Sequence, residues 1–503
     1  MALIDSLVQL VRSLQKSEKR AFRLACRQSN YTDLFDIIDG GDRLSAQQIR
    51  QEFEKDHEGA FPSAVSYLYK TLLDVLLDLR ENRDRTLALF NRIAKASVLF
   101  EKSMARESLD MLEDVRKEAA QYECYEVLLY ASRLELEFLS FLNMPDISET
   151  ELLEKQFGIN GTLKHIQAVY EQSALYELLK HRIIYKGDVR SARQMTMMND
   201  LVFSEHSIFM SSRDSLEARR RHLLFQSYYL MNVGNRRLAS QAFYELDTLY
   251  QECPQFKENP SLYYVSVIEG ILASLRSLRK FEEMVYFIER LDGIADKASY
   301  FRDYLLTLSA LYKLLFFLDS GDFESALGQM KNSGCFSPER HFTFFRPEIA
   351  LYSALVHIGL GNYRTAGKIL ADGIFHGDSI YDLPIYRTLR LTRLIVHYEM
   401  ADMEYVLSEV RSMKRVFAKD GKSHRMELLI FELVGGDRLR RMRRDERESL
   451  WARTEPELCD IRKDVFEMQL LKIFDFTAYV ESRICRVPLS ETIRKNISFY
   501  SQE

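Results

Sequence analysis

Apolar side chains recur along most of this chain at the spacing of one helix face. Near the N-terminus they lie three or four positions apart, at Leu3, Ile4, Leu7, Val8, Leu10, Val11 and Leu14. A second stretch, SAVSYLYKTLLDVLLDL at residues 63–79, predicts a longer amphipathic helix. Further stretches of this kind follow, separated by short polar joints. The pattern predicts an all-α protein.

One of these joints, SGDFESAL at residues 320–327, recurs at regular intervals. Its glycine is suited to end one helix, and the aspartate after it is suited to cap the next. Intervals of 45, 42, 40 and 40 residues separate the aligned positions Gly234, Arg279, Gly321, Gly361 and Ala401. The regular spacing indicates a repeat rather than an isolated turn.

The residues after each joint support this interpretation. Four of the five residues at the second position favour helix N-caps: Asn235, Lys280, Asp322, Asn362 and Asp402. Five and nine places after the first position lie apolar residues, which share one helix face: Ala239, Met284, Ala326, Ala366 and Val406, then Phe243, Ile288, Met330, Leu370 and Val410. Each unit is therefore predicted to be a helical hairpin, with Ala326 and Ala366 buried at close helix approaches.

A similar joint lies upstream, around Ser103, with Ser108 and Leu112 at the packing positions. Helix pairs are therefore expected from about residue 90 to 420. The predicted domains are an N-terminal helical block at 1–90, a repeat array at 91–420 and a C-terminal helical cap at 421–503.

The joints resemble the second half of a tetratricopeptide repeat, with its Gly-Asp-Tyr-x-x-Ala pattern. The first half of that consensus is poorly met, and the units exceed the usual 34 residues by roughly 6–11. This resemblance implies a right-handed α-solenoid of degenerate tetratricopeptide-like hairpins with helical caps at both ends.

The opening segment carries a second resemblance. SLVQLVRSLQKSEKRAFRLA, followed by YLYKTLLDVLLDL, resembles the start of a large, uncharacterised family of bacterial cytosolic helical-repeat proteins, whose members begin with a Lys-Ser-Glu-Lys-Arg segment. The resemblance implies a fold and no biochemical activity.

Composition and charge agree with an ordinary globular protein of the cytoplasm. The chain has 503 residues, 47% of them hydrophobic, and a formal net charge of −5. Its 20 glycines and 9 prolines are few, as expected for a helical chain. The N-terminus makes a poor signal peptide, and the most apolar run, 304–318, is too short to span a membrane. Six cysteines without a C-x-x-C pair indicate reduced thiols.

Positive charge is concentrated near the C-terminus. Residues 411–447 hold twelve Lys or Arg and six Asp or Glu. Arg440, Arg444 and Arg447 are spaced to share one helix face, where phosphates or acidic peptides would dock. The favoured alternative is a face whose arginines pair with the neighbouring acids. Nucleic acid is therefore not the expected partner.

Catalytic and cofactor motifs are missing from the sequence. The pentapeptide GGDRL occurs at 40–44 and 435–439, but neither copy has the flanking residues of a phosphate loop, and we interpret both as helix ends. His357 and His397 occupy the same repeat position, where a metal pair is conceivable and two packed histidines are favoured. The sequence predicts no enzyme, no cofactor and no metal.

The predicted function is a non-enzymatic scaffold that binds a protein or peptide in a concave groove formed by the first helix of each hairpin. The resemblance to tetratricopeptide repeats implies which positions of each first helix face the groove: Arg221, Tyr228, Asn232, Glu269, Arg276, Leu311, Leu315, Glu348, Leu351, Leu355, Tyr398 and Glu399. The alternative is a nucleic-acid-associated transcriptional or signalling regulator, which would use the N-terminal block or the helix at 438–453.

Overall fold

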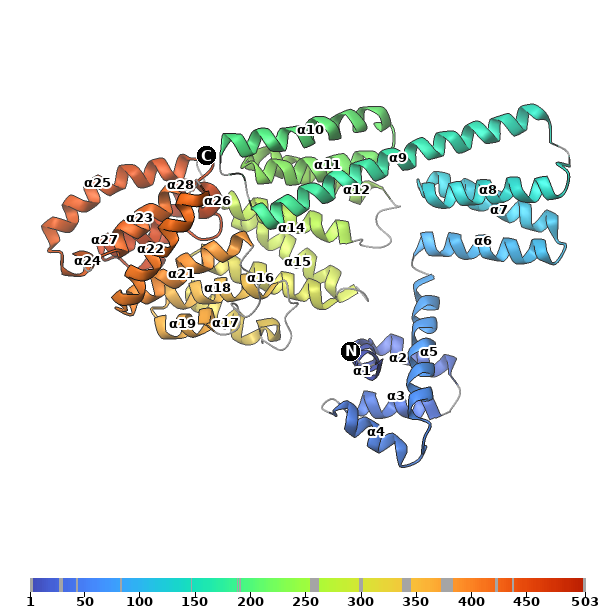
Figure 1. The fold of residues 1–503 in the computed structure, drawn as a ribbon, viewed down its shortest axis with the longest axis horizontal. Helices are drawn as coiled ribbons and strands as arrows, with labels where there is room; N and C mark the ends of the chain where they lie inside the picture. The colour runs from blue at the N-terminus through green and yellow to red at the C-terminus, as the bar shows by residue number, and fades with distance from the viewer. Residues whose placement is uncertain are drawn as a thin grey trace. The chain divides into compact units, whose positions relative to one another are not determined.

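The computed structural model describes residues 3–500 apart from 27–29, 42–43, 82–83, 146, 188, 190, 254–261, 298–301, 337–344, 372–382, 421–423 and 437. Within these residues all regular structure is helical and no β-strand occurs (Figure 1). The prediction of an all-α protein is confirmed. In this part of the chain no helix is long and apolar enough to cross a membrane.

The chain forms two compact units, Met1–Ile166 and Gln167–Glu503, and the division falls within the long helix α9 (Glu149–Lys186). The first unit also contains α1 (Leu3–Ser13), α2 (Lys16–Ala25), α3 (Asn30–Gly40), α4 (Ala46–Glu54), α5 (Phe61–Glu81), α6 (Arg85–Glu101), α7 (Ala105–Gln121) and α8 (Tyr125–Phe141). Helices α1 to α5 share one hydrophobic core, and α6 to α8 share another.

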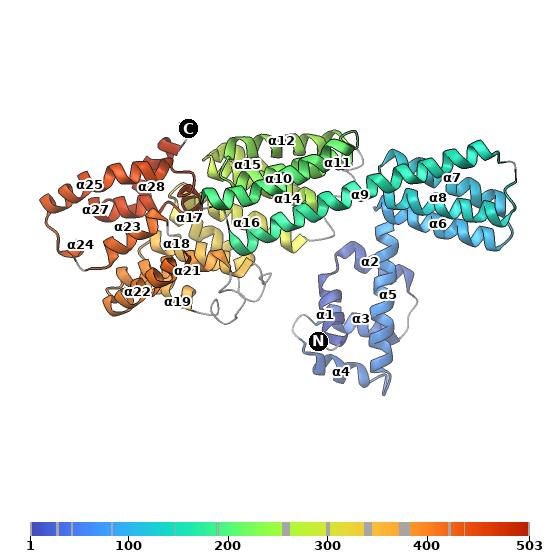
Figure 2. The same ribbon diagram turned by 45° about the horizontal axis from the view of Figure 1, so that its top comes forward.

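The second unit continues with shorter helices, which Figure 2 shows from another side. They are α10 (Ala192–Ser212), α11 (Leu216–Asn232), α12 (Arg236–Glu252), α14 (Leu262–Ser277), α15 (Phe281–Lys297), α16 (Arg302–Asp319), α17 (Phe323–Asn332), the 3₁₀ turn η1 (Gly334–Phe336), α18 (Arg346–Gly359), α19 (Tyr363–Ala371), α21 (Pro384–Glu399), α22 (Met403–Asp420), α23 (Arg425–Val434), α24 (Arg438–Arg441), α25 (Arg444–Lys463), α26 (Met468–Leu471), α27 (Phe476–Cys485) and α28 (Leu489–Tyr500). The predicted domain boundaries at 90 and 420 follow the repeat pattern of the sequence, whereas the two compact units follow the contacts between helices. The predicted boundaries therefore stay predictions.

All five predicted turns are present, and they share one geometry. The aligned residues have a positive φ of 86°, 55°, 70°, 72° and 65°, at Gly234, Arg279, Gly321, Gly361 and Ala401. After each of them, the next backbone N–H donates to the carbonyl five residues earlier, as in a Schellman helix end. The side chains of Asn235, Asp322 and Asp402 cap the following helices. The repeat is therefore a repeated helix-end motif.

The same motif extends upstream. Ser103 and Glu123 have φ values of 62° and 51° and join α6 to α7 and α7 to α8. Ser108 and Leu112 are fully buried, as predicted. Ser108 Oγ donates to the carbonyl of Ala96 at 2.7 Å, which fixes α7 closely against α6.

Consecutive helices pack against each other from α14 to α19, and so do the alternate pairs α11 with α14, α14 with α16, and α16 with α18. Ala326 and Ala366 are fully buried, which confirms the prediction for these two positions. The helix ends predicted from GGDRL are also found, because α3 ends at Gly40 and α23 ends just before Gly435. The expected caps Asp42 and Asp437 lie outside the described residues.

The C-terminal helices pack against the turns of this array. A Cβ atom built on Gly321 would lie 2.8 Å from the carbonyl oxygen of Ser490 in α28, and one built on Gly234 would lie 2.5 Å from Val465 Cγ1. No atom lies within 4 Å of the same position at Gly361. Two of the five turns therefore lack the space for a side chain, because the C-terminal segment fills it.

These glycines permit a matched pair of substitutions. Gly321→Ala and Gly361→Ala impose the same backbone strain, because φ is 70° and 72°. Only Gly321→Ala also forces the backbone of Ser490 away. We expect Gly321→Ala to lower the free energy of unfolding by about 1–3 kcal/mol more than Gly361→Ala, measured by urea denaturation. Equal losses would contradict the docking of α28 on this turn.

A candidate partner-binding cavity

The structure contains a cavity of about 240 Å³ on the first helices of four successive hairpins. Helices α11, α14, α16 and α18 contribute to its wall. In this series, α11 contacts α14, α14 contacts α16, and α16 contacts α18. Seven of the predicted groove positions line it together: Tyr228, Asn232, Glu269, Arg276, Leu311, Leu315 and Glu348. The tetratricopeptide resemblance therefore selected residues that meet in space, while their binding role stays a prediction.

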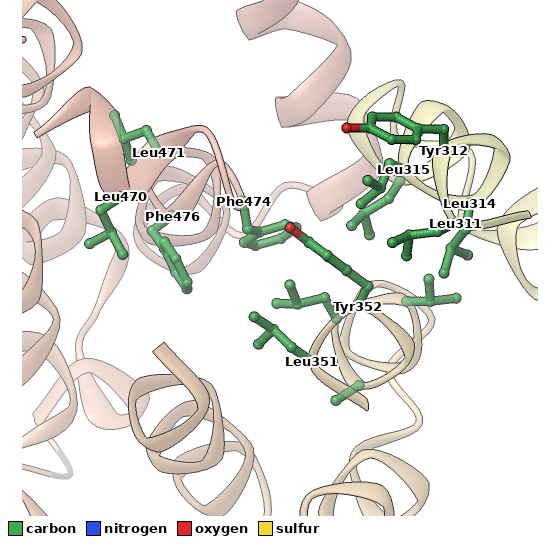
Figure 3. Close-up of a cluster of buried hydrophobic side chains, with 14 of the residues drawn as sticks. Leu311, Tyr312, Leu314, Leu315, Leu351, Tyr352, Leu470, Leu471, Phe474 and Phe476 are labelled. Carbon is green, nitrogen blue, oxygen red and sulfur yellow. The ribbon is translucent and has the colours of Figure 1, made fainter. Parts of the chain in front are cut away.

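The chain's own C-terminal segment forms another wall of this cavity. Lys472 and Ile473, which follow α26, line it directly. Gln469 Nε2 donates to the carbonyl of Asn232 at 3.1 Å. Figure 3 shows Phe474 of this segment and Tyr352 of α18 reaching toward one another. Much of the expected groove is therefore filled from within the molecule.

Arg276 holds this segment in place. Its guanidinium donates to Asp319 at 2.6 and 3.2 Å, to the hydroxyl of Tyr352 at 3.2 Å, and to the carbonyl of Ile473 at 2.8 Å. Arg276 and Asp319 are both buried. A buried ion pair is stable only when such additional bonds satisfy its remaining donors and acceptors.

The other five predicted groove residues lie elsewhere. Leu351 and Leu355 are in the hydrophobic core, and Arg221 pairs with Glu217 and donates to Ser173. Tyr398 is buried, and its carbonyl accepts a hydrogen bond from Arg440. Glu399 accepts a hydrogen bond from Tyr479 at 2.7 Å and pairs with Arg483 at 2.6 Å. In the later hairpins, the groove positions therefore contact α24 and α27 of the same chain.

The arginines of the proposed anion patch do not lie on one helix. Arg440 belongs to α24, whereas Arg444 and Arg447 belong to α25, so the prediction of a shared helix face is wrong. The physical reason is that a new helix begins after Arg443, whose backbone N–H donates to the Glu446 carboxylate at 2.9 Å. Two of the three arginines also bind backbone carbonyls of the chain itself. Arg440 donates to Tyr398 and Glu399, and Arg447 donates to Arg483 at 2.8 Å and to Ile484 at 3.2 Å.

Arg444 instead forms a surface ion pair with Glu448 at 2.9 Å, as in the favoured alternative. The two histidines of the equivalent repeat position also differ. His397 pairs with Asp402 at 2.9 Å and stacks on Tyr405, whereas burial lowers the pKa of His357. Among the described residues, no group of three or more His, Cys, Asp or Glu side chains is placed to hold a metal ion.

Two glutamates give the cavity its electrostatic character. Glu269 and Glu348 are half-buried, and neither carboxylate makes a hydrogen bond or an ion pair with the described part of the chain. Burial raises the pKa of Glu269, an effect that the charge of Lys180 partly opposes. Burial and then the charge of Glu269 raise the pKa of Glu348 to about 7, although Arg276 lowers it.

Several important residues near the cavity were missed in the sequence. Lys180 lies on α9, ahead of the five aligned joints, with its ammonium 3.8 Å from the centre of the Tyr228 ring. Burial lowers its pKa, and the charge of Glu269 opposes this effect. Lys472 and Ile473 follow the repeats by many residues, and no sequence signal connects them to the groove. Asp319 directly precedes the joint SGDFESAL. A charged residue at the end of an apolar stretch was a sequence signal for a buried ion pair.

Comparisons with models of protein families, with curated proteins and with solved structures found no match to this chain. The functional argument therefore depends on the geometry and the charges of the cavity.

Replacing Glu348 by Gln tests the electrostatics of the cavity. The pKa of about 7 lies above the ordinary value of 4.5, so the folded state holds an extra proton between these pH values. The stability from this carboxyl is therefore present at low pH and falls as pH rises through about 7. Glutamine cannot ionise, so we expect Glu348→Gln to raise the free energy of unfolding at pH 8, on the order of 1–3 kcal/mol, and to change it little at pH 5.

Urea denaturation at both pH values measures this difference. The control is Glu404→Gln, which removes the same charge from an exposed position on α22. An equal effect of Glu348→Gln at pH 5 and pH 8 would contradict the raised pKa.

Proposed function

We propose that this protein is a non-enzymatic scaffold that binds a segment of a partner protein in the cavity between α11, α14, α16 and α18. The observation that carries the proposal is the convergence of seven predicted groove positions on one cavity. Repeat proteins commonly bind partners on surfaces formed by equivalent positions of successive repeats. A right-handed solenoid and membership of the bacterial helical-repeat family are part of the same proposal, as is a cytoplasmic location.

Contacts between alternate helices support the solenoid in this proposal. Helices α11, α14, α16 and α18 each pack against the next member of the series, although a second helix of a hairpin separates them in sequence. Such packing is typical of stacked helical hairpins, in which each hairpin covers the core of its neighbour.

The C-terminal segment limits what the cavity accommodates. Because Ile473 and the residues around it occupy one side, an extended partner would not follow the whole array. The open space suits one or two side chains of a short segment. The protein would therefore recognise a short linear sequence rather than a folded surface.

The regulator is the weaker candidate. Arg440 and Arg447 donate hydrogen bonds to backbone carbonyls of the chain, and Arg444 forms an ion pair with Glu448. Binding of nucleic acid usually depends on several cations that contact phosphates together. We therefore do not propose nucleic acid as the partner.

Filling the cavity provides the test. Ala273 lies on its wall, and Ala273→Phe places a ring inside it. The purified full chain and this variant would be screened against a displayed library of random 12-residue peptides. We expect a set of peptides to bind the parent protein and to lose at least tenfold in affinity for Ala273→Phe, because the ring and the peptide side chain compete for one space.

The control variant is Ala452→Phe, which adds the same ring to an exposed position on α25. It should bind the selected peptides like the parent protein. Circular dichroism would verify that both variants are folded. The proposal fails when no peptide binds, or when the bound peptides do not distinguish Ala273→Phe from Ala452→Phe.

A further inference from the structure

The geometry of the cavity points to a specific chemistry for its occupant. We propose that the cavity binds the cationic end of a lysine or arginine side chain of the partner segment, between the carboxylates of Glu269 and Glu348. This inference rests on the proposed function and names the recognition element of that site.

The size of the cavity suits such a side chain. An apolar cavity of about 150 Å³ is enough to bind benzene. The cavity described above is larger, at about 240 Å³, and polar groups line part of it. Leu308, Leu311 and Leu315 of α16 offer an apolar wall for the methylene stem of a lysine or arginine.

The carboxylates supply the charge complement. Glu269 comes from α14 and Glu348 from α18, so the stacking of two hairpins brings them to one cavity. Buried or half-buried acids are normally paired or hydrogen-bonded. These two have no such partner within the described chain, and the charge of Glu269 raises the pKa of Glu348. An entering cation would satisfy both and relieve their repulsion.

Aromatic rings add a second feature that favours cations. Tyr228, Tyr312 and Tyr352 line the cavity. The protein already places its own cations against two of these rings, since Lys180 lies 3.8 Å from the centre of Tyr228 and Arg276 lies 5.2 Å from the centre of Tyr352. Attraction between a cation and the face of an aromatic ring strengthens when water is excluded.

An anionic occupant fits less well. Arg276 is committed to Asp319, Tyr352 and the carbonyl of Ile473, and Lys180 lies against Tyr228 and near Glu269. Lys472 adds one more positive charge to the lining of the cavity. An anion would meet the two carboxylates without a guanidinium available to bind it. Among the described residues, the charged and titratable groups that line the cavity or interact electrostatically with the two glutamates are Tyr176, Lys180, Tyr228, Arg276, Tyr304, Tyr312, Tyr352 and Lys472.

Binding should depend on pH. The pKa of Glu348 is raised to about 7, and a cation binds the ionised form of this carboxyl. The affinity for a basic side chain should therefore increase as the pH rises from 6 to 8. An uncharged occupant would show no such increase.

Peptides selected by the library screen supply the first measurement. We expect the cavity-dependent peptides to share one lysine or arginine. Replacing that residue by glutamine should weaken binding by about tenfold or more, and so should Glu269→Gln or Glu348→Gln in the protein. The increase in affinity from pH 6 to 8 should be smaller in Glu348→Gln. Glu404→Gln, which removes an exposed charge, should bind like the parent protein.

The second measurement uses n-butylammonium chloride, which has the end group and stem of lysine, with sodium chloride at equal ionic strength as the reference. We expect n-butylammonium to raise the melting temperature of the parent protein and of Glu404→Gln at pH 8. It should leave the double variant Glu269→Gln/Glu348→Gln unchanged relative to sodium chloride.

The outcomes separate this inference from the proposed function. Peptides that depend on Ala273 but share no basic residue would overturn the inference and leave the scaffold intact. Absence of any cavity-dependent peptide would overturn the scaffold. If n-butylammonium binds in that case, the cavity is a site for small amines, and the assignment to a partner side chain is wrong.

Discussion

The buried contact between Arg276 and Asp319 connects the parts of the second unit on which the cavity depends. It joins α14 to α16 and, through the hydroxyl of Tyr352 and the carbonyl of Ile473, to α18 and the C-terminal segment. Arg279, at one of the five turns, pairs with the same Asp319 at 3.1 Å. Removing one partner of a buried ion pair typically costs about 3–5 kcal/mol, because the other charge is left without compensation.

The C-terminal segment is consequently an integral part of the core rather than a detachable cover. Phe474, Phe476 and Tyr479 are buried, and they belong to the same hydrophobic core as the helices of the repeats. This arrangement divides the groove into a filled part, where Glu399 pairs with Arg483, and an open part, where Glu269 and Glu348 have no ion-pair partner among the described residues. Glu399 already has a basic partner within the chain, whereas Glu269 and Glu348 are available to a cation from outside. This difference is the physical basis for placing the proposed partner-binding site in the open part of the groove.

The hairpins of the array could be predicted because each helix end is specified locally. A residue that tolerates positive φ, a cap and apolar residues four positions apart are enough to define it. Arg279 and Ala401 adopt the same conformation as the three glycines, so the spacing identified the turns even where the preferred residue was missing. The prediction of one helix that carries Arg440 and Arg447 was wrong, because a new helix begins after Arg443. Both side chains bind backbone carbonyls of other helices.

The sequence by itself determined the helical class, the five turns and the positions at which successive hairpins face one another. These features depend on residues a few positions apart or on a regular interval of about 40. Only the tertiary structure decided which of the facing positions remain open. The hydrogen bond from Arg276 to Ile473 joins residues 197 positions apart and uses a backbone carbonyl. Every residue has such a carbonyl, so no pattern of side chains indicates which one enters the groove.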